Sequence, residues 1–129
     1  MRAPPAALKA FLDLYRKGEF WESHEVLEGP WRALRSEFYH GLILYASAWV
    51  HWQRGNAHGV GAQLGKTITR LEAVPEAYLG LDVEAIRLHC RVVIRVMRQG
   101  GPGWAKRIGP LVLRYDATAA TGRESEWAA

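Results

Sequence analysis

The sequence is poor in the features that mark secreted or membrane proteins. Its 129 residues include a single cysteine, Cys90, which cannot form a disulfide within the chain. Because disulfides stabilise many secreted proteins, we expect a reduced, cytoplasmic protein. The longest largely apolar run, Gly41–Val50, has ten residues, whereas a membrane-spanning helix needs about twenty. The first residues also lack the apolar stretch of a signal peptide, so we expect no membrane partner.

Strong charge bias and strand patterns are lacking as well. The formal net charge is +4 and 49% of the residues are hydrophobic, which excludes disorder for most of the chain. No run alternates between apolar and polar residues next to hairpin turn signals. A chain of this length suits one domain, which can bury about two-thirds of its unfolded surface without a disulfide or a metal. The sequence therefore indicates one helical domain.

Helical periodicity predicts an all-α, single-domain bundle of about five helices. Glycine, proline and capping residues mark the helix ends, and Asn56 and Asp82 are expected to cap the last two helices. A proline inside a helix removes an amide donor and collides with the carbonyl four residues earlier, so Gly29-Pro30 predicts a kink or break in the second helix. The expected helices begin at Pro4-Pro5 and at about Glu19, and then span about 37–54, 58–74 and 82–99.

The third expected helix is the most hydrophobic segment of the chain. Apolar residues lie nearly all round it, which is typical of a central, buried helix. On the fourth helix, small residues are expected to allow close approach to the third, namely Gly59, Gly61, Ala62 and Gly65. A glycine-rich stretch over 100–103 then ends the fifth helix. We therefore expect a bundle domain over residues 1–103, followed by a partly frayed C-terminal extension over 104–129.

A group of histidines and glutamates on the second and third helices carries the strongest chemical signal. His24 and Glu28 are four residues apart and are therefore neighbours on the helix surface. Glu25 and Glu28 are three apart and can both reach one point in front of the helix. His51 lies on the apolar third helix, which suggests that it faces the second helix inside the bundle. We predict that His51 hydrogen-bonds Glu25 or Glu28.

Three interpretations of this His/Glu cluster stay open. The one we favour is a buried polar network that satisfies polar groups between packed helices. In the second, Glu25, Glu28 and His51 bind a divalent transition metal in a hydrolase or oxidoreductase. The spacing differs, however, from the Glu-x-x-His of di-iron bundles and the His-Glu-x-x-His of zinc proteases. In the third, the same residues form a metal-free pocket for a small ligand.

Five strings of the sequence, two of which contain His24 and His51, also match a known pattern. They are Phe20-Trp21-Glu22-Ser23-His24-Glu25-Val26-Leu27-Glu28-x-x-Trp31-Arg32, Phe38-x-x-Gly41-Leu42-Ile43, Ala46-x-Ala48-x-x-His51, Gly55-Asn56 and Gly80-Leu81-Asp82. Over about residues 10–90 the chain thus resembles the family grouped as domain of unknown function 309. The resemblance implies a small all-α bundle and assigns no activity. Its polar positions correspond to His24, Glu25, Glu28, His51 and Asn56. The chain departs from the family pattern at Gly29-Pro30 and at His40, which makes His40 a poor candidate for an essential ligand.

Four arginines are predicted to share one face of the fifth helix, within an arc of roughly 80°: Arg87, Arg91, Arg95 and Arg98. With a sequence pI of about 9.5, this stripe is a candidate contact for nucleic-acid phosphates. The alternative, which we favour, is a solvated helix face. No recognised helix-turn-helix, zinc-finger or RNA-binding signature predicts base-specific binding.

The six tryptophans are expected mainly in the core or at an interface, because large aromatic side chains dominate burial in small bundles. Surplus aromatic surface would also support a homodimer, so a homo-oligomer is one predicted partner. Cys90 falls on the apolar side of the fifth helix and is expected to be an inert, buried thiol.

Overall fold

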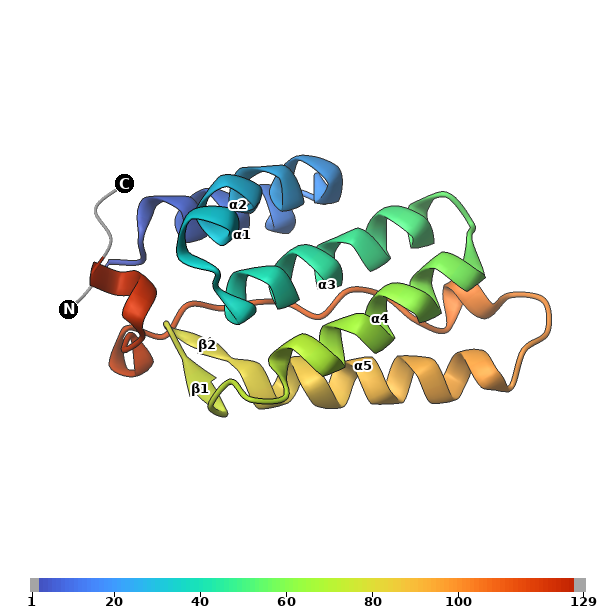
Figure 1. The fold of residues 1–129 in the computed structure, drawn as a ribbon. Helices are drawn as coiled ribbons and strands as arrows, with labels where there is room; N and C mark the ends of the chain where they lie inside the picture. The colour runs from blue at the N-terminus through green and yellow to red at the C-terminus, as the bar shows by residue number, and fades with distance from the viewer. Residues whose placement is uncertain (1–2, 127–129) are drawn as a thin grey trace.

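The computed structural model describes residues 3–126 of the chain (Figure 1). Within these residues it contains five α-helices, which confirms the predicted all-α bundle. They are α1 (Ala6–Arg16), α2 (Phe20–Leu34), α3 (Glu37–Gln53), α4 (Ala57–Leu71) and α5 (Val83–Arg98). Two very short strands, β1 (Ala77–Tyr78) and β2 (Leu81–Asp82), pair antiparallel just before α5. The sequence showed no sign of them, because two residues are too few for an alternating pattern.

Helix α3 is the centre of the bundle. It lies between the α1–α2 pair on one side and the α4–α5 pair on the other (Figure 1). Ten of its seventeen residues are buried, and Trp49 is completely so. The prediction that the most hydrophobic segment forms the central helix is therefore confirmed. None of the described helices combines the length and apolarity that crossing a bilayer requires.

Short polar side chains begin three of the helices. Ser36, Asn56 and Asp82 each accept a hydrogen bond from a backbone N–H three residues later, at 2.9–3.0 Å. Each cap satisfies a donor that the first turn of a helix leaves without a partner. The predicted caps at Asn56 and Asp82 are therefore confirmed.

Helix α2 continues through Gly29-Pro30, so of the predicted kink or break, the break is wrong and the kink stays a prediction. A proline in a helix interior costs about 3 kcal/mol. Tertiary packing on both sides of it offsets this cost: Leu27 is completely buried, and the Trp31 ring stacks on His40 with ring centroids 4.1 Å apart. Burying a leucine contributes about 1.5–3 kcal/mol, and an aromatic stack adds about 1 kcal/mol.

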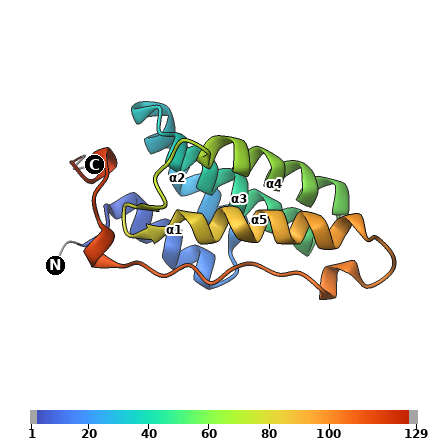
Figure 2. The same cartoon turned by 90° about the horizontal axis from the view of Figure 1, so that it is seen from below.

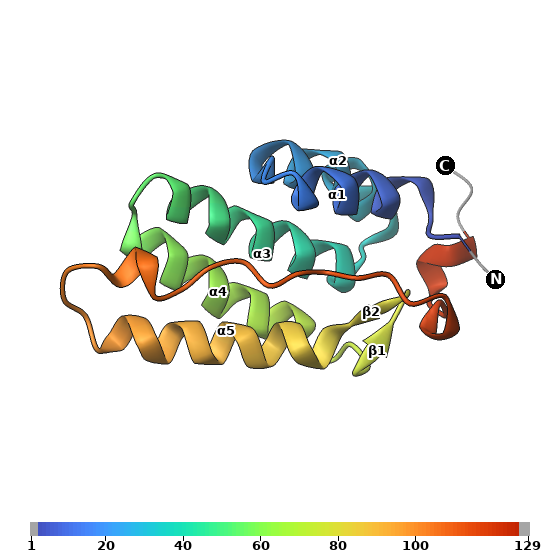
Figure 3. The same ribbon diagram turned by 180° about the vertical axis from the view of Figure 1, so that it is seen from behind.

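After α5 the chain turns back and follows the bundle over its length (Figures 2 and 3). The turn uses Gly100, Gly101 and Gly103, whose φ angles of 65°, 88° and 82° lie in the left-handed region that favours glycine. We call residues 107–116, which are largely extended, the return segment. Its Leu113 is buried against the bundle.

The division into a 1–103 domain and a 104–129 extension stays a prediction. Residues 104–126 pack on the bundle through the return segment and three short 3₁₀ helices, Trp104–Lys106, Ala117–Ala119 and Arg123–Glu126. Residues 127–129 of the predicted frayed tail lie outside the described residues.

Candidate functional site

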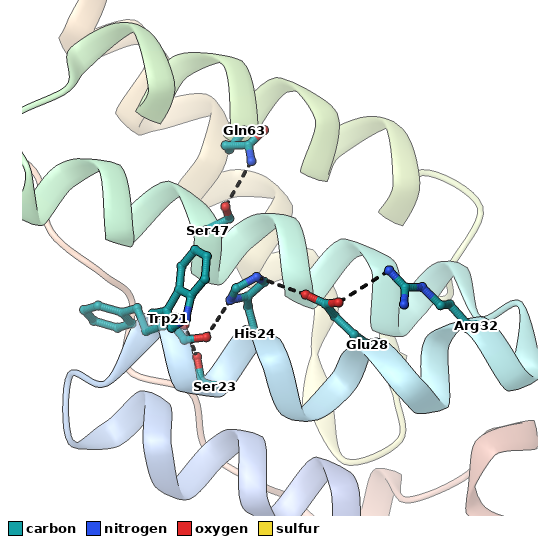
Figure 4. A network of polar contacts seen from close by, with 8 residues as sticks. Trp21, Ser23, His24, Glu28, Arg32, Ser47 and Gln63 are labelled. Carbon is teal, nitrogen blue, oxygen red and sulfur yellow. Dashed lines mark hydrogen bonds and ion pairs between the residues drawn. The ribbon is translucent and has the colours of Figure 1, made fainter.

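His24 is the centre of a polar network along α2, on the side of the helix that faces α3 (Figure 4). Its Nε2 atom lies 3.2 Å from Oε1 of Glu28, and its Nδ1 atom lies 2.5 Å from the carbonyl oxygen of Trp21. Both partners are hydrogen-bond acceptors, toward which a ring N–H donates. Oε2 of Glu28 lies 3.5 Å from the Arg32 guanidinium. The residues Trp21, His24, Glu28 and Arg32 form what we call the α2 network.

Exposure to solvent increases along the α2 network. The side chain of His24 is 12% exposed, that of Glu28 is 35% exposed and that of Arg32 is 70% exposed. Solvent therefore screens the Glu28–Arg32 ion pair strongly, and exposed pairs of this kind contribute only about 0–1 kcal/mol. Glu25 is exposed, and its side chain makes no hydrogen bond or ion pair within the described part of the chain.

His51 contacts the beginning of α4 instead of α2. Its Nδ1 atom lies 3.1 Å from the side-chain Nδ2 of Asn56, which donates to the ring. The other side-chain atom of Asn56, Oδ1, already caps α4 by accepting from Gly59 N–H. In the described structure, the predicted hydrogen bond from His51 to Glu25 or Glu28 is not formed. The sequence analysis did not predict this contact, because it assigned Asn56 to the cap and to the family pattern and not to a contact with His51.

Gly59 makes the contact between His51 and α4 possible. A Cβ atom at this position would collide with the His51 imidazole, so only glycine lets the helix approach the ring this closely. Gly61 and Gly65 have open space where a Cβ would lie. Of the predicted close approaches to α3 by glycines, the one at Gly59 is thus present, and those at Gly61 and Gly65 are wrong.

The three predicted metal ligands lie in different environments. Glu28 faces His24 and Arg32, Glu25 is exposed, and His51 contacts Asn56. Within residues 3–126, no group of three or more His, Cys, Asp or Glu side chains is placed to hold a metal ion. A divalent transition metal at this cluster stays a prediction from the sequence.

Further side-chain contacts join the helices around the α2 network. Gln63 of α4 donates to the hydroxyl of Ser47 on α3 at 3.0 Å, across the helix interface shown in Figure 4. The Arg54 guanidinium lies 6.0 Å from the centre of the Trp21 ring, within the range of a cation–π contact.

Burial lowers the pKa of His40, and nearby Arg70 adds to the effect. The His40 ring stacks on Trp31, which gives His40 a packing role, in agreement with its departure from the family pattern.

A second polar network attaches the return segment to the bundle, and the sequence did not predict it. The Tyr45 hydroxyl lies 2.7 Å from Nδ1 of His89 and accepts a hydrogen bond from Leu111 N–H at 3.1 Å. The Tyr15 hydroxyl donates to the Leu111 carbonyl at 2.5 Å. His89 also forms a backbone hydrogen bond with Gly109. Side chains from three helices thus replace the strand partners that an extended segment needs.

Burial changes the acid–base behaviour of this second network. Desolvation lowers the pKa of His89, and its hydrogen bond with Gly109 opposes the effect. Desolvation also raises the pKa values of Tyr15 and Tyr45 well above their usual range. These residues are therefore neutral near pH 7. On the same helix, burial raises the pKa of the Cys90 thiol to about 12, which fits the predicted inert thiol.

A cavity of about 390 Å³ lies beside the second network, where the α1–α2 turn meets the return segment. Aromatic and aliphatic side chains dominate its wall, and Arg16 and Lys17 supply two cations. Trp52 is held at the wall by a hydrogen bond from its indole N–H to the Ala105 carbonyl, at 2.9 Å. The lining residues are Tyr15, Arg16, Lys17, Gly18, Phe20, Trp52, Gln53 and 110–113.

Arg87 does not belong to the predicted exposed stripe of α5. It is only 7% exposed, and its guanidinium donates to the carbonyls of Leu71 and Val74 at 2.7 and 2.8 Å and to Glu84 at 2.8 Å. Arg87 thus satisfies carbonyls at and just beyond the C-terminal end of α4. Helical angle alone placed it with the other arginines and did not reveal the neighbouring helix end.

The other three arginines of the stripe are exposed. Together with Ile68 of α4 and Ile94 of α5, they line a depression of about 270 Å³, which we call the arginine cleft. Its basic residues are Arg91, Arg95 and Arg98.

Comparison with known proteins supports the family resemblance. Residues 8–62 match the family described as Domain of unknown function (DUF309), which confirms the resemblance inferred from the motifs. An uncharacterized protein of Aquifex aeolicus (strain VF5) is 25% identical over 92 residues. This alignment covers 68% of the chain but only 28% of the Aquifex protein. The family match contains the α2 network and the His51–Asn56 pair, and it stops before α5.

Proposed function

We propose that this protein is a cytoplasmic, small-ligand-binding domain whose ligand occupies the cavity at the α1–α2 turn. The observation that carries the proposal is an apolar wall with two cations beside it. Tyr15, Phe20 and Trp52 contribute to the wall, and exposed Arg16 and Lys17 are the cations. A small molecule with an apolar body and an anionic end would match both parts. Cavities of this size with a few convergent polar groups commonly hold small ligands.

In this proposal the α2 network has a supporting role. Both ring nitrogens of His24 are already occupied, and the ring is largely buried, so it has no free donor for a ligand. The network stiffens the N-terminal half of α2. Phe20, the first residue of this helix, lies in the cavity wall. The cavity therefore lies next to the His/Glu cluster, but its lining includes none of the four residues from which the sequence predicted a pocket.

Decanoate, a ten-carbon carboxylate, is a suitable probe for this cavity. We expect saturable binding in isothermal calorimetry, accompanied by a change in tryptophan fluorescence because Trp52 lines the site. Replacing the two cations in Arg16→Gln/Lys17→Gln should weaken binding about tenfold, which corresponds to about 1.4 kcal/mol. Decanol, which lacks the charge, should bind wild type about as weakly as decanoate binds this variant.

The matched control for decanoate binding is Arg91→Gln/Arg95→Gln. It removes two positive charges from α5, away from the cavity lining, and should bind decanoate as wild type does. Equal weakening in both double variants would reveal a response to net charge alone. That outcome, or the lack of saturable binding to wild type, would contradict the proposed site.

We also propose that the protein forms a homodimer through the aromatic surface of α2. Trp21 is 49% exposed, although Arg54 and His24 contact its ring. Exposed tryptophans are frequent anchors of protein interfaces. Sedimentation equilibrium should give the mass of a dimer for wild type and of a monomer for Trp21→Ala. A monomeric wild type at high concentration would remove this proposal and leave the cavity proposal unaffected.

A further inference from the structure

The arginine cleft has a geometry that the ligand cavity does not explain. Arg91, Arg95 and Arg98 are separated by four and three residues, so their side chains leave one face of α5. All three line the same depression, with Ile68 and Ile94 as its apolar part. The cleft lies on the α4–α5 side of the bundle, whereas the ligand cavity is lined by α1, α2, α3 and the return segment.

The three cleft arginines lack the acidic partners that several other arginines of the chain have. Arg32 pairs with Glu28, Arg70 pairs with Glu37, and Arg87 pairs with Glu84. Across the described residues, the side chains of Arg91, Arg95 and Arg98 form no hydrogen bond or ion pair. Like charges four residues apart on a helix repel each other. An anion bound among them would therefore relieve an unfavourable arrangement.

Counter-charges for the cleft are scarce in the surrounding sequence. Residues 83–114 contain seven Lys or Arg and one acidic residue, a net charge of +6. The rest of the chain contains ten Lys or Arg and twelve acidic residues, a net charge of −2. The acidic residue of the basic part, Glu84, is 2.8 Å from the Arg87 guanidinium. This excess of positive charge in one stretch of the sequence favours the binding of polyanions.

We propose that the arginine cleft binds nucleic acid through its phosphate backbone, without base selectivity. Guanidinium groups match phosphate oxygens with two parallel hydrogen bonds. From Arg91 to Arg98 the helix axis advances about 10 Å, so the row suits several phosphates in line better than one compact anion. The isoleucines of the cleft, with half-exposed Leu88 and Val92 on α5, offer apolar contacts to sugars and bases.

Fluorescence anisotropy with a labelled twelve-nucleotide oligothymidylate tests the proposal on the full chain. Binding to wild type should weaken linearly on a log–log plot against salt concentration. The slope should be about −2, because each of three neutralised phosphates contributes about −0.7 for a single strand. In Arg91→Gln/Arg95→Gln, one phosphate contact remains, so the slope should become shallower, at about −0.7. The affinity in low salt should decrease at least tenfold. Because both side chains are exposed and unpaired, this variant should melt as wild type does.

The control is Arg16→Gln/Lys17→Gln, which removes the same charge at the ligand cavity. It should keep the wild-type slope and most of the affinity. Equal oligonucleotide binding by wild type and Arg91→Gln/Arg95→Gln would overturn the proposal. It would also be overturned if inorganic tripolyphosphate bound the cleft while the oligonucleotide did not, since the site would then serve a small anion. Because each double variant is the control for the other site, failure of one proposal leaves the other testable.

Discussion

The glutamates of α2 and the arginines of α5 are both rows of like charges at helical spacing, but their surroundings differ. Glu28 has a basic group one turn away on either side, His24 and Arg32. Arg95 has Arg91 and Arg98 in the corresponding places, and a depression in front of them. Glu28 thus belongs to a network within its own helix, whereas the arginines present unpaired charge to solvent. Charge at a helix surface therefore indicates binding only when neighbours on the helix do not neutralise it.

Arg87 and Arg91 allow the same comparison within one helix. It lies four residues before Arg91, but Glu84 precedes it by three residues and the end of α4 lies beside it. Arg87 is consequently buried and structural, whereas Arg91 is exposed. A single helix thus contains both kinds of arginine, distinguished by what surrounds each guanidinium.

The largest expected effect is the loss of stability in Arg87→Ala. Removing the guanidinium leaves the carbonyls of Leu71 and Val74 and the Glu84 carboxylate without their partner. The free energy of unfolding from urea denaturation should fall by about 3 kcal/mol. Arg91→Ala, on the same helix, should change it by no more than about 0.5 kcal/mol. Similar losses in both variants would remove the distinction between paired and unpaired arginines.

A smaller loss of stability is expected at acidic pH, because His89 is partly buried. Burial lowers the pKa of His89 in the folded protein below its ordinary value of 6.5. Below about pH 6.5 the unfolded chain therefore binds protons before the folded protein does, and stability present above this pH is lost as pH falls. The loss should stay under about 1.4 kcal/mol per pH unit, which is the limit when the unfolded chain binds one proton more than the folded protein.

Urea denaturation at pH 7.5 and 5.5 measures this acid effect. His89→Gln should show less destabilisation between the two pH values than wild type, since it removes one of the titrating groups. His58→Gln, at an exposed position of α4, serves as the control and should behave as wild type. An unchanged pH dependence in His89→Gln would show that the second network does not control acid stability.

The smallest expected effect is that of Glu28→Ala in the α2 network. The variant removes an acceptor from His24, but the carboxylate is 35% exposed and water replaces part of the interaction. Stability should fall by roughly 0.5–1 kcal/mol. Glu25→Ala, three residues away and without a described partner, should have almost no effect. Thermal melts with and without a chelator also test the metal hypothesis: a loss that requires metal would favour it over the structural network.

Much of the fold follows from local patterns that the sequence displays. The five helices, the caps at Asn56 and Asp82 and the central place of α3 were all predicted, because helical spacing and capping involve residues within a few positions of one another. The break at Pro30 was wrong because packing of Leu27 and Trp31 outweighs a local penalty. Of the candidate site, the sequence identified the His24–Glu28 pair, which lies within one helix.

By itself, the sequence determined the helices, the face of each helix on which its charges lie, and the resemblance to a family of unknown function. Only the tertiary structure decided which group faces which. His51 contacts Asn56 instead of Glu28, and Arg87 contacts the end of α4. The second network joins Leu111 to Tyr45 and Tyr15, which precede it by 66 and 96 residues. Periodicity fixes the angle of a side chain about its own helix axis, whereas its partners depend on how helices and the return segment pack.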